Sequence, residues 1–105
     1  MISVTHFRAD DAGFEHRGRD ALSVLAARPG FLRGSLGRST DDDADWVLVT
    51  EWENVGSYRR ALGNYEVKVR AAPMLAEALD LASSFESLVD AEPGGATSAH
   101  TSDRA

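Results

Sequence analysis

The chain has 105 residues, no cysteine and a formal net charge of −6 at pH 7. The absence of thiols excludes disulfides, thiol catalysis and cysteine-ligated zinc, and the scattered lysine and arginine residues form no basic stripe of the kind that binds nucleic acid. We therefore expect a single domain in the reducing cytoplasm that does not bind nucleic acid.

The chain also lacks sequence signals for a membrane. No apolar run reaches the roughly 20 residues that cross a bilayer, and residues 1–6 have neither the charged start nor the long apolar centre of a signal peptide. We expect no membrane partner and no processing. Because a chain of this size buries only part of its apolar surface, a homodimer would add useful burial.

Hydrophobic spacing predicts the first strand and the first helix. Residues 2–7 alternate in the manner of a short strand. After the acidic cap Asp10-Asp11, apolar residues recur three or four positions apart until Pro29-Gly30 stops the pattern. This spacing predicts an amphipathic helix that packs on a sheet.

A hairpin follows the helix. Residues 32–39 and 46–52 each alternate between two faces, and the acidic run 40–45 separates them. This run lacks the glycine and the distal glutamate of a calcium-binding loop. We interpret it as the solvated tip of the hairpin and not as a metal site.

The second half of the chain is predicted to be mainly helical. Asn54 is placed to cap a helix that continues to Leu62. Residues 65–81 also have a helical pattern, in which Pro73 marks a kink or a restart. Residues 85–89 are predicted to form the last strand.

These elements define a domain over residues 1–90. Their order, strand-helix-strand-strand-helix-strand, is that of the ferredoxin-like split β-α-β fold, an α+β fold with a four-stranded antiparallel sheet and helices on one face. Because Val47 and Val49 alternate with inward residues such as Trp46, the second face is also apolar and is predicted to pack against a copy of itself. Residues 91–105 are too poor in apolar side chains to offset the entropy of ordering, so we expect a disordered C-terminal tail.

Four segments point to a known family. They are Arg28-Pro29-Gly30-Phe31-Leu32, the strand 46–53, Ser57-Tyr58-Arg59 and the segment 79–89. In this order, within residues 1–90, they resemble the antibiotic biosynthesis monooxygenase family, whose members are dimeric α+β barrel proteins. That family includes oxygenases that convert phenols of aromatic polyketides to quinones without flavin or metal, haem-degrading oxygenases, and members of unknown function. The resemblance implies a homodimeric barrel of the fold predicted above.

For the quinone-forming members, the resemblance implies a cleft between the sheet and the helices that holds a flat phenolic substrate. Trp52 and Tyr58 match the pocket tryptophan and tyrosine, and Arg70 is the candidate for an arginine that stabilises negative charge. Leu48 and Met74 complete the predicted pocket. A substrate that has lost a proton is electron-rich enough to reduce molecular oxygen itself, so the resemblance implies no cofactor.

Two alternatives stay open. The quinone-forming members have an asparagine at the position of Leu48, and leucine can neither donate nor accept a hydrogen bond. A non-catalytic dimeric domain that binds a small molecule, or an accessory domain, would use Trp52 as a core anchor and Arg70 as a solvated helix charge. Haem degradation is the weaker alternative, because it requires an iron-binding histidine on the helix after the third strand and none lies between Arg17 and Ala99.

Overall fold

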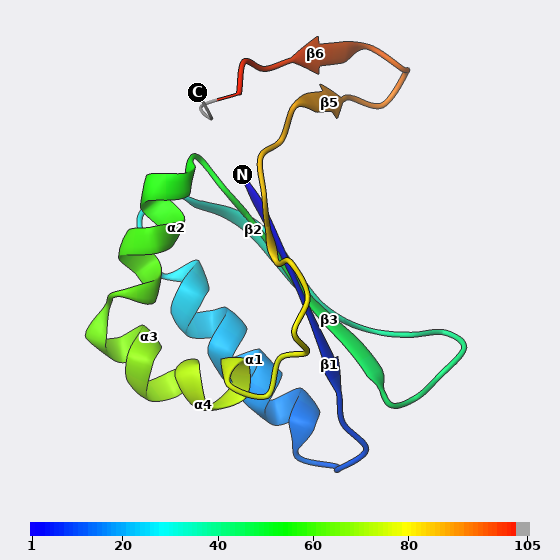
Figure 1. Ribbon diagram of the computed structural model, residues 1–105, viewed down its shortest axis with the longest axis vertical. Helices are drawn as coiled ribbons and strands as arrows, with labels where there is room; N and C mark the ends of the chain where they lie inside the picture. Colours follow the sequence, from blue (N-terminus) through cyan, green and yellow to red (C-terminus); the bar gives the residue numbers. More distant parts are fainter. Residues whose placement is uncertain (103–105) are drawn as a thin grey trace.

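The computed structural model describes residues 1–102 and places a sheet beside a layer of helices (Figure 1). The elements of the body are β1 (Ile2–Arg8), α1 (Phe14–Ala26), β2 (Phe31–Arg38), β3 (Asp45–Trp52), α2 (Val55–Leu62), α3 (Tyr65–Arg70), α4 (Ala72–Leu75) and β4 (Ser84–Phe85). The predicted order of strands and helices is confirmed, with the second helical segment divided into short helices.

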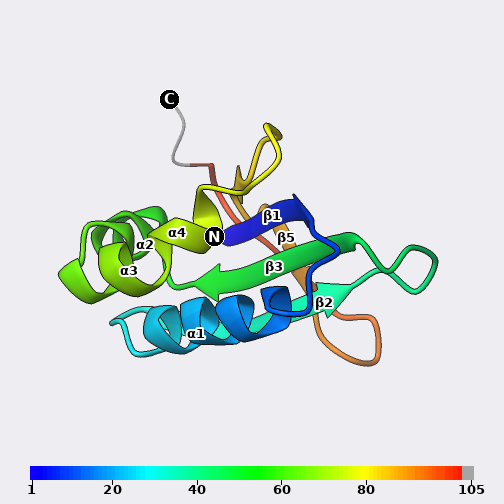
Figure 2. The same cartoon turned by 90° about the horizontal axis from the view of Figure 1, so that it is seen from below.

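The four strands form an antiparallel sheet in the order β2-β3-β1-β4. The central strands β1 and β3 are paired along their length, from Ile2 opposite Glu51 to Arg8 opposite Asp45. The helices cover one face of this sheet (Figures 1 and 2). The predicted ferredoxin-like α+β fold is therefore confirmed.

Burial alternates along the central strands, as a half-buried strand requires. In β3, Trp46, Leu48, Thr50 and Trp52 are buried, whereas the residues between them are half-buried and point to the other face. The inward side chains pack with helix residues in a core that also contains Phe7, Phe14, Ala21, Val24, Leu25, Ala61, Val67, Ala71 and Met74. Side chains from distant parts of the sequence therefore meet on the helix-facing side of the sheet.

Asparagine side chains begin both α2 and α3. Asn54 accepts a hydrogen bond from the backbone N–H of Ser57 at 2.8 Å, and α2 ends at Leu62, as predicted. Asn64 accepts one from the backbone N–H of Val67 at 3.3 Å. These caps satisfy N–H groups that have no partner inside the helix, so each cap fixes where its helix begins.

The helix predicted over residues 65–81 is shorter in the structure. Its regular part ends at Leu75. Pro73 lies in the first turn of α4, where its missing N–H removes no hydrogen bond within the helix. Leu79 and Leu81, which extend the apolar pattern in the sequence, are exposed. Without a surface to pack on, a short helical pattern does not sustain a helix.

The C-terminal segment forms a separate hairpin, in which β5 (Val89–Ala91) pairs with β6 (Thr97–Ala99). The last strand, predicted over residues 85–89, is thus divided between β4 and β5. Most of this exposed hairpin lies within the predicted tail, whose disorder stays a prediction, and residues 103–105 of that tail lie outside the described residues. Figure 1 shows the hairpin standing away from the helices.

Two kinds of feature are missing from residues 1–102. In this part of the chain no helix is long and apolar enough to cross a membrane. The same residues contain no group of three or more His, Asp or Glu side chains that could hold a metal ion.

Candidate active site

Trp52 and Tyr58 meet where the end of β3 passes into α2. Trp52 is 1% exposed and Tyr58 is half-buried, and their ring centroids lie 5.7 Å apart. Phe31 approaches the indole edge-on, at 5.3 Å and 89°. The structure therefore brings together the two aromatic residues that the sequence analysis places in one pocket.

The indole N–H of Trp52 already has a partner. It donates a hydrogen bond to Oγ1 of Thr50 at 2.8 Å, and this oxygen lies 2.5 Å from Oγ of Ser3. Ser3 and Thr50 are both buried. An indole has one donor and no acceptor, so the single donor of Trp52 is used within the sheet.

The hydroxyl of Tyr58 lies in a mixed environment. Burial raises the pKa of Tyr58, and hydrogen bonding with Ser3 and Ser84 lowers it by a smaller amount. The phenol therefore stays protonated at neutral pH, because its pKa moves upward from the ordinary value of about 10. A protonated tyrosine acts as a hydrogen-bond donor.

Leu48 and Met74 lie in the closed core. They are 2% and 1% exposed, and both belong to the cluster that holds the sheet and the helices together. Leu48 points to the same side of β3 as Trp52. These two residues fill the interior beside Trp52 with apolar side chains.

Arg70 lies at the surface. Its guanidinium donates to Asp20 of α1 at 2.5 Å, and this contact lowers the pKa of the Asp20 carboxyl. The Arg70 side chain is 40% exposed. The structure does not bring Arg70 to the Trp52–Tyr58 pair, and its charge is already balanced by a carboxylate.

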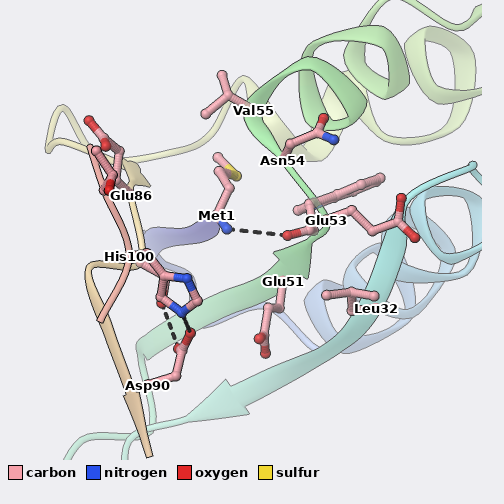
Figure 3. A pocket seen from close by; sticks show the side chains of 12 residues that line it. Met1, Leu32, Glu51, Glu53, Asn54, Val55, Glu86, Asp90 and His100 are labelled. Atoms are coloured by element: carbon pink, nitrogen blue, oxygen red, sulfur yellow. Dashed lines mark hydrogen bonds and ion pairs between the residues drawn. The ribbon is translucent and has the colours of Figure 1, made fainter. Parts of the chain in front are cut away.

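A cavity of about 320 Å³ lies beside Trp52, between the end of β3 and the C-terminal hairpin (Figure 3). Its other lining residues are Met1, Leu32, Glu51, Glu53, Asn54, Val55, Glu86, Ser87, Asp90, His100 and Thr101. In Figure 3, Asp90 and His100 form one wall, with His100 Nε2 at 2.6 Å from Asp90 Oδ2. The carboxylates on its walls disfavour an anionic ligand. The sequence analysis placed four residues in a pocket, and the structure describes all four. Of these, Trp52 lines this cavity, whereas Leu48, Tyr58 and Met74 do not.

Sequence reasoning missed the hydroxyl residues next to the aromatic pair. Ser3 and Thr50 occupy inward positions of β1 and β3, on the same side of the sheet as the apolar residues Phe7 and Leu48. A polar side chain at an inward strand position was the available signal. Strand alternation alone does not show which inward positions of two strands lie opposite each other.

Comparison with known proteins places the chain in a family. No curated protein matches the chain. A crystal structure of SnoaB, a cofactor-independent oxygenase from Streptomyces nogalater, is 28% identical, with a TM-score of 0.66 over 74% of this chain and 82% of that chain. The crystal structure of a mutant of the same protein, also 28% identical, has a TM-score of 0.67 over the same shares of the two chains. A conserved protein from Methanosarcina mazei Go1, 15% identical with a TM-score of 0.64 over 79% of this chain and 84% of that chain, shares the fold.

The sequence match agrees with these structures. Residues 1–73 match the family model described as antibiotic biosynthesis monooxygenase. This stretch includes β1 to α3, and therefore both members of the Trp52–Tyr58 pair. Because the match spans well over half of the 105 residues, the chain belongs to the antibiotic biosynthesis monooxygenase family.

Proposed function

We propose that this protein is a cytoplasmic, homodimeric and cofactor-independent monooxygenase that oxidises a phenolic, polyketide-like aromatic to a quinone. Family membership and the similarity to SnoaB, a cofactor-independent oxygenase, support the reaction class. The observation that carries the proposal is the position of Tyr58, a half-buried and protonated phenol against the ring of the buried Trp52.

The substrate itself supplies the electrons in this reaction. A phenol that loses its proton becomes an electron-rich phenolate and reduces molecular oxygen. One oxygen atom joins a ring carbon, the other leaves as water, and the phenol becomes a quinone, so no external reductant is needed. A hydrogen bond from Tyr58 to the phenolate oxygen would stabilise the charge that this oxygen carries.

The proposed roles differ from residue to residue. Trp52 serves as the aromatic wall of the site, because its N–H is bound to Thr50. Tyr58 serves as the donor to the substrate oxygen. We assign no contact with substrate to Arg70, which pairs with Asp20 at the surface.

A second candidate is a non-catalytic domain that binds a small molecule. It is favoured by one observation, namely that Leu48, at the position where the quinone-forming members have an asparagine, is buried together with Met74 in a closed apolar core. Such a domain would hold its ligand in the cavity beside Trp52.

Oxygen consumption distinguishes the two candidates. With a panel of anthrone-like phenols, we expect Tyr58→Phe to lower the rate by about tenfold to a hundredfold, because the variant keeps the ring and loses the donor. Tyr65→Phe is the matched control, since Tyr65 is 75% exposed. No turnover above buffer by the wild type, or an unchanged rate in Tyr58→Phe, would favour the binding domain.

A further inference from the structure

Helix α1 lies along the edge strand β2 (Figure 2), and the two elements pack closely where one of them has a glycine. A Cβ built at Gly34 of β2 would lie 2.7 Å from Cδ1 of Leu22. Further along the strand, a Cβ built at Gly18 of α1 would lie 2.5 Å from Cδ2 of Leu36. The next inward residue of β2 is Arg38, the last residue of the strand. A long side chain there replaces the small residues that allow the close approach.

A cavity of about 350 Å³ lies at this end of α1 and β2. It is lined by Glu15, Arg19 and Leu22 of α1 and by Leu36, Arg38 and Trp46 of the sheet. The three helix residues form one stripe, because residues three or four positions apart lie on the same side of a helix. An adjoining cavity of about 260 Å³ is also lined by Arg38 and Trp46 and has His16 on its wall. We call the first cavity the Arg38 groove.

The guanidinium of Arg38 rests on a fixed aromatic ring. Arg38 is opposite Trp46 in the sheet, and residues opposite each other in antiparallel strands point to the same face. The guanidinium lies over the indole at 5.3 Å from the ring centroid. Trp46 is 8% exposed, donates its N–H to the backbone carbonyl of Ala9 at 3.1 Å and packs against Phe14. The stacked guanidinium is therefore held in one orientation.

The positive charge of Arg38 is not balanced by the protein. Within residues 1–102, no carboxylate forms an ion pair with this guanidinium. On the opposite wall, Arg19 pairs with Glu15 at 3.1 Å, so these two charges cancel. The Arg38 groove therefore presents one net positive charge in a chain whose net charge is −6. A stacked guanidinium has its N–H donors at its edge, and their spacing matches the two oxygens of a carboxylate.

We propose that the Arg38 groove binds a small monocarboxylate with an apolar body. The carboxylate accepts two N–H bonds from Arg38, and the apolar body lies against the half-buried side chains of Leu22 and Leu36. One negative charge suits the groove better than two, because Glu15 lines the same cavity and repels a dianion. This site goes beyond the proposed function, because Trp46 and Trp52 lie at opposite ends of β3 and binding requires no turnover.

An NMR titration with 2-naphthoate tests the site. The chain has two tryptophans, so Trp52→Phe assigns the indole N–H of Trp46. We expect saturable shifts of this signal and of the Arg38 Nε–H. Arg38→Gln should raise Kd at least about tenfold, because the charge-assisted hydrogen bonds are lost. Arg38→Lys, which keeps a cation but not the planar donors, should raise Kd about threefold.

Two controls make the result specific. Arg33→Gln is the matched variant and should leave Kd unchanged, because Arg33 is on the same strand, points to the other face and is 78% exposed. The neutral 2-naphthamide should give no saturable shift, since it has the same rings without the charge. The Trp46 indole signal shows in each variant that the fold is kept, and Arg38→Lys decides the test if Arg38→Gln does not fold.

Three results would overturn the proposal. Equal Kd values for the wild type and both Arg38 variants would leave this arginine as an inward charge that protects the sheet edge from pairing. Equal binding of 2-naphthamide would show that the groove takes up apolar rings without recognising a carboxylate. Displacement of 2-naphthoate by inorganic phosphate at equal concentration would show a general anion site in place of a monocarboxylate site.

Discussion

Gly30 joins α1 to β2 at a place where the chain has no room for a side chain. Its φ is +88°, a backbone conformation that residues with a Cβ rarely adopt. A Cβ built there would lie 2.4 Å from Cβ of Ser57 in α2. The carbonyl of Gly30 also accepts the backbone N–H of Glu53 at 2.8 Å. Gly30 thus sets how closely the start of β2 approaches the helix that holds Tyr58.

We expect Gly30→Ala to lower the free energy of unfolding by about 2 kcal/mol or more, since backbone strain and the clash with Ser57 add. Gly37→Ala is the control, because a Cβ there would meet Val47 Cγ2 at an ordinary 3.5 Å. Urea unfolding of both variants measures the difference. Equal midpoints for the two variants would contradict this account of Gly30.

At the scale of elements, α2 depends on its cap. The side chain of Asn54 accepts both the backbone N–H and the hydroxyl of Ser57, at 2.8 and 3.0 Å. We expect Asn54→Ala to lower stability by about 1 kcal/mol and Asn54→Asp to keep most of it, because aspartate is an equally good cap. Thermal unfolding measures both. A loss in Asn54→Asp as large as in Asn54→Ala would show that capping is not what the side chain contributes.

The C-terminal hairpin is an element with few contacts. β5 and β6 are exposed throughout and pair with each other, apart from the main sheet. An isolated two-stranded hairpin is at best marginally stable, so deletion of residues 94–105 should leave Tm unchanged within error. A fall of several degrees on calorimetry would show that this segment packs on the body or on a partner subunit.

The elements of the body were predictable where one physical rule decides them. The alternation of side chains predicted which residues of β3 point inward, and the capping residue Asn54 predicted where α2 begins. The end of the helical segment was not predictable, because the apolar residues Leu79 and Leu81 continue a pattern that finds no packing surface.

The candidate site, too, was predictable only in part. The meeting of Trp52 and Tyr58 follows from a strand end followed by a capped helix. The surface position of Arg70 and the link from Ser3 to Thr50 depend on helix rotation and on strand register, which local sequence does not encode.

At the scale of the whole molecule, one face of the sheet is uncovered. Val4 lies opposite Val49 in the central strands, Val47 lies two residues before Val49, and all three are half-buried on the side away from the helices. An apolar sheet face of this kind is suited to an interface between two copies. We propose that the homodimer forms through this face.

We expect Val49→Glu to weaken the dimer by at least about a hundredfold, since a carboxylate buried in an apolar interface is strongly unfavourable. Val69→Glu is the control, because Val69 is 51% exposed on α3. Light scattering at micromolar concentration measures both. A monomeric wild type, or a dimer that persists in Val49→Glu, would contradict the proposed interface.

The shortness of β4 also affects how often this strand opens. This strand is held to β1 through two residue pairs, Ile2 with Phe85 and Ser3 with Ser84. Local opening of such an edge requires far less free energy than global unfolding, so we expect its amide hydrogens to exchange well before those of β1 and β3. Each opening separates Ser84 from Ser3 and leaves the backbone edge of β1 at Ile2 and Ser3 without its neighbouring strand. Access of water to this edge would then have a rate of its own, set by the fluctuation of a two-residue strand and separate from the rate of global unfolding.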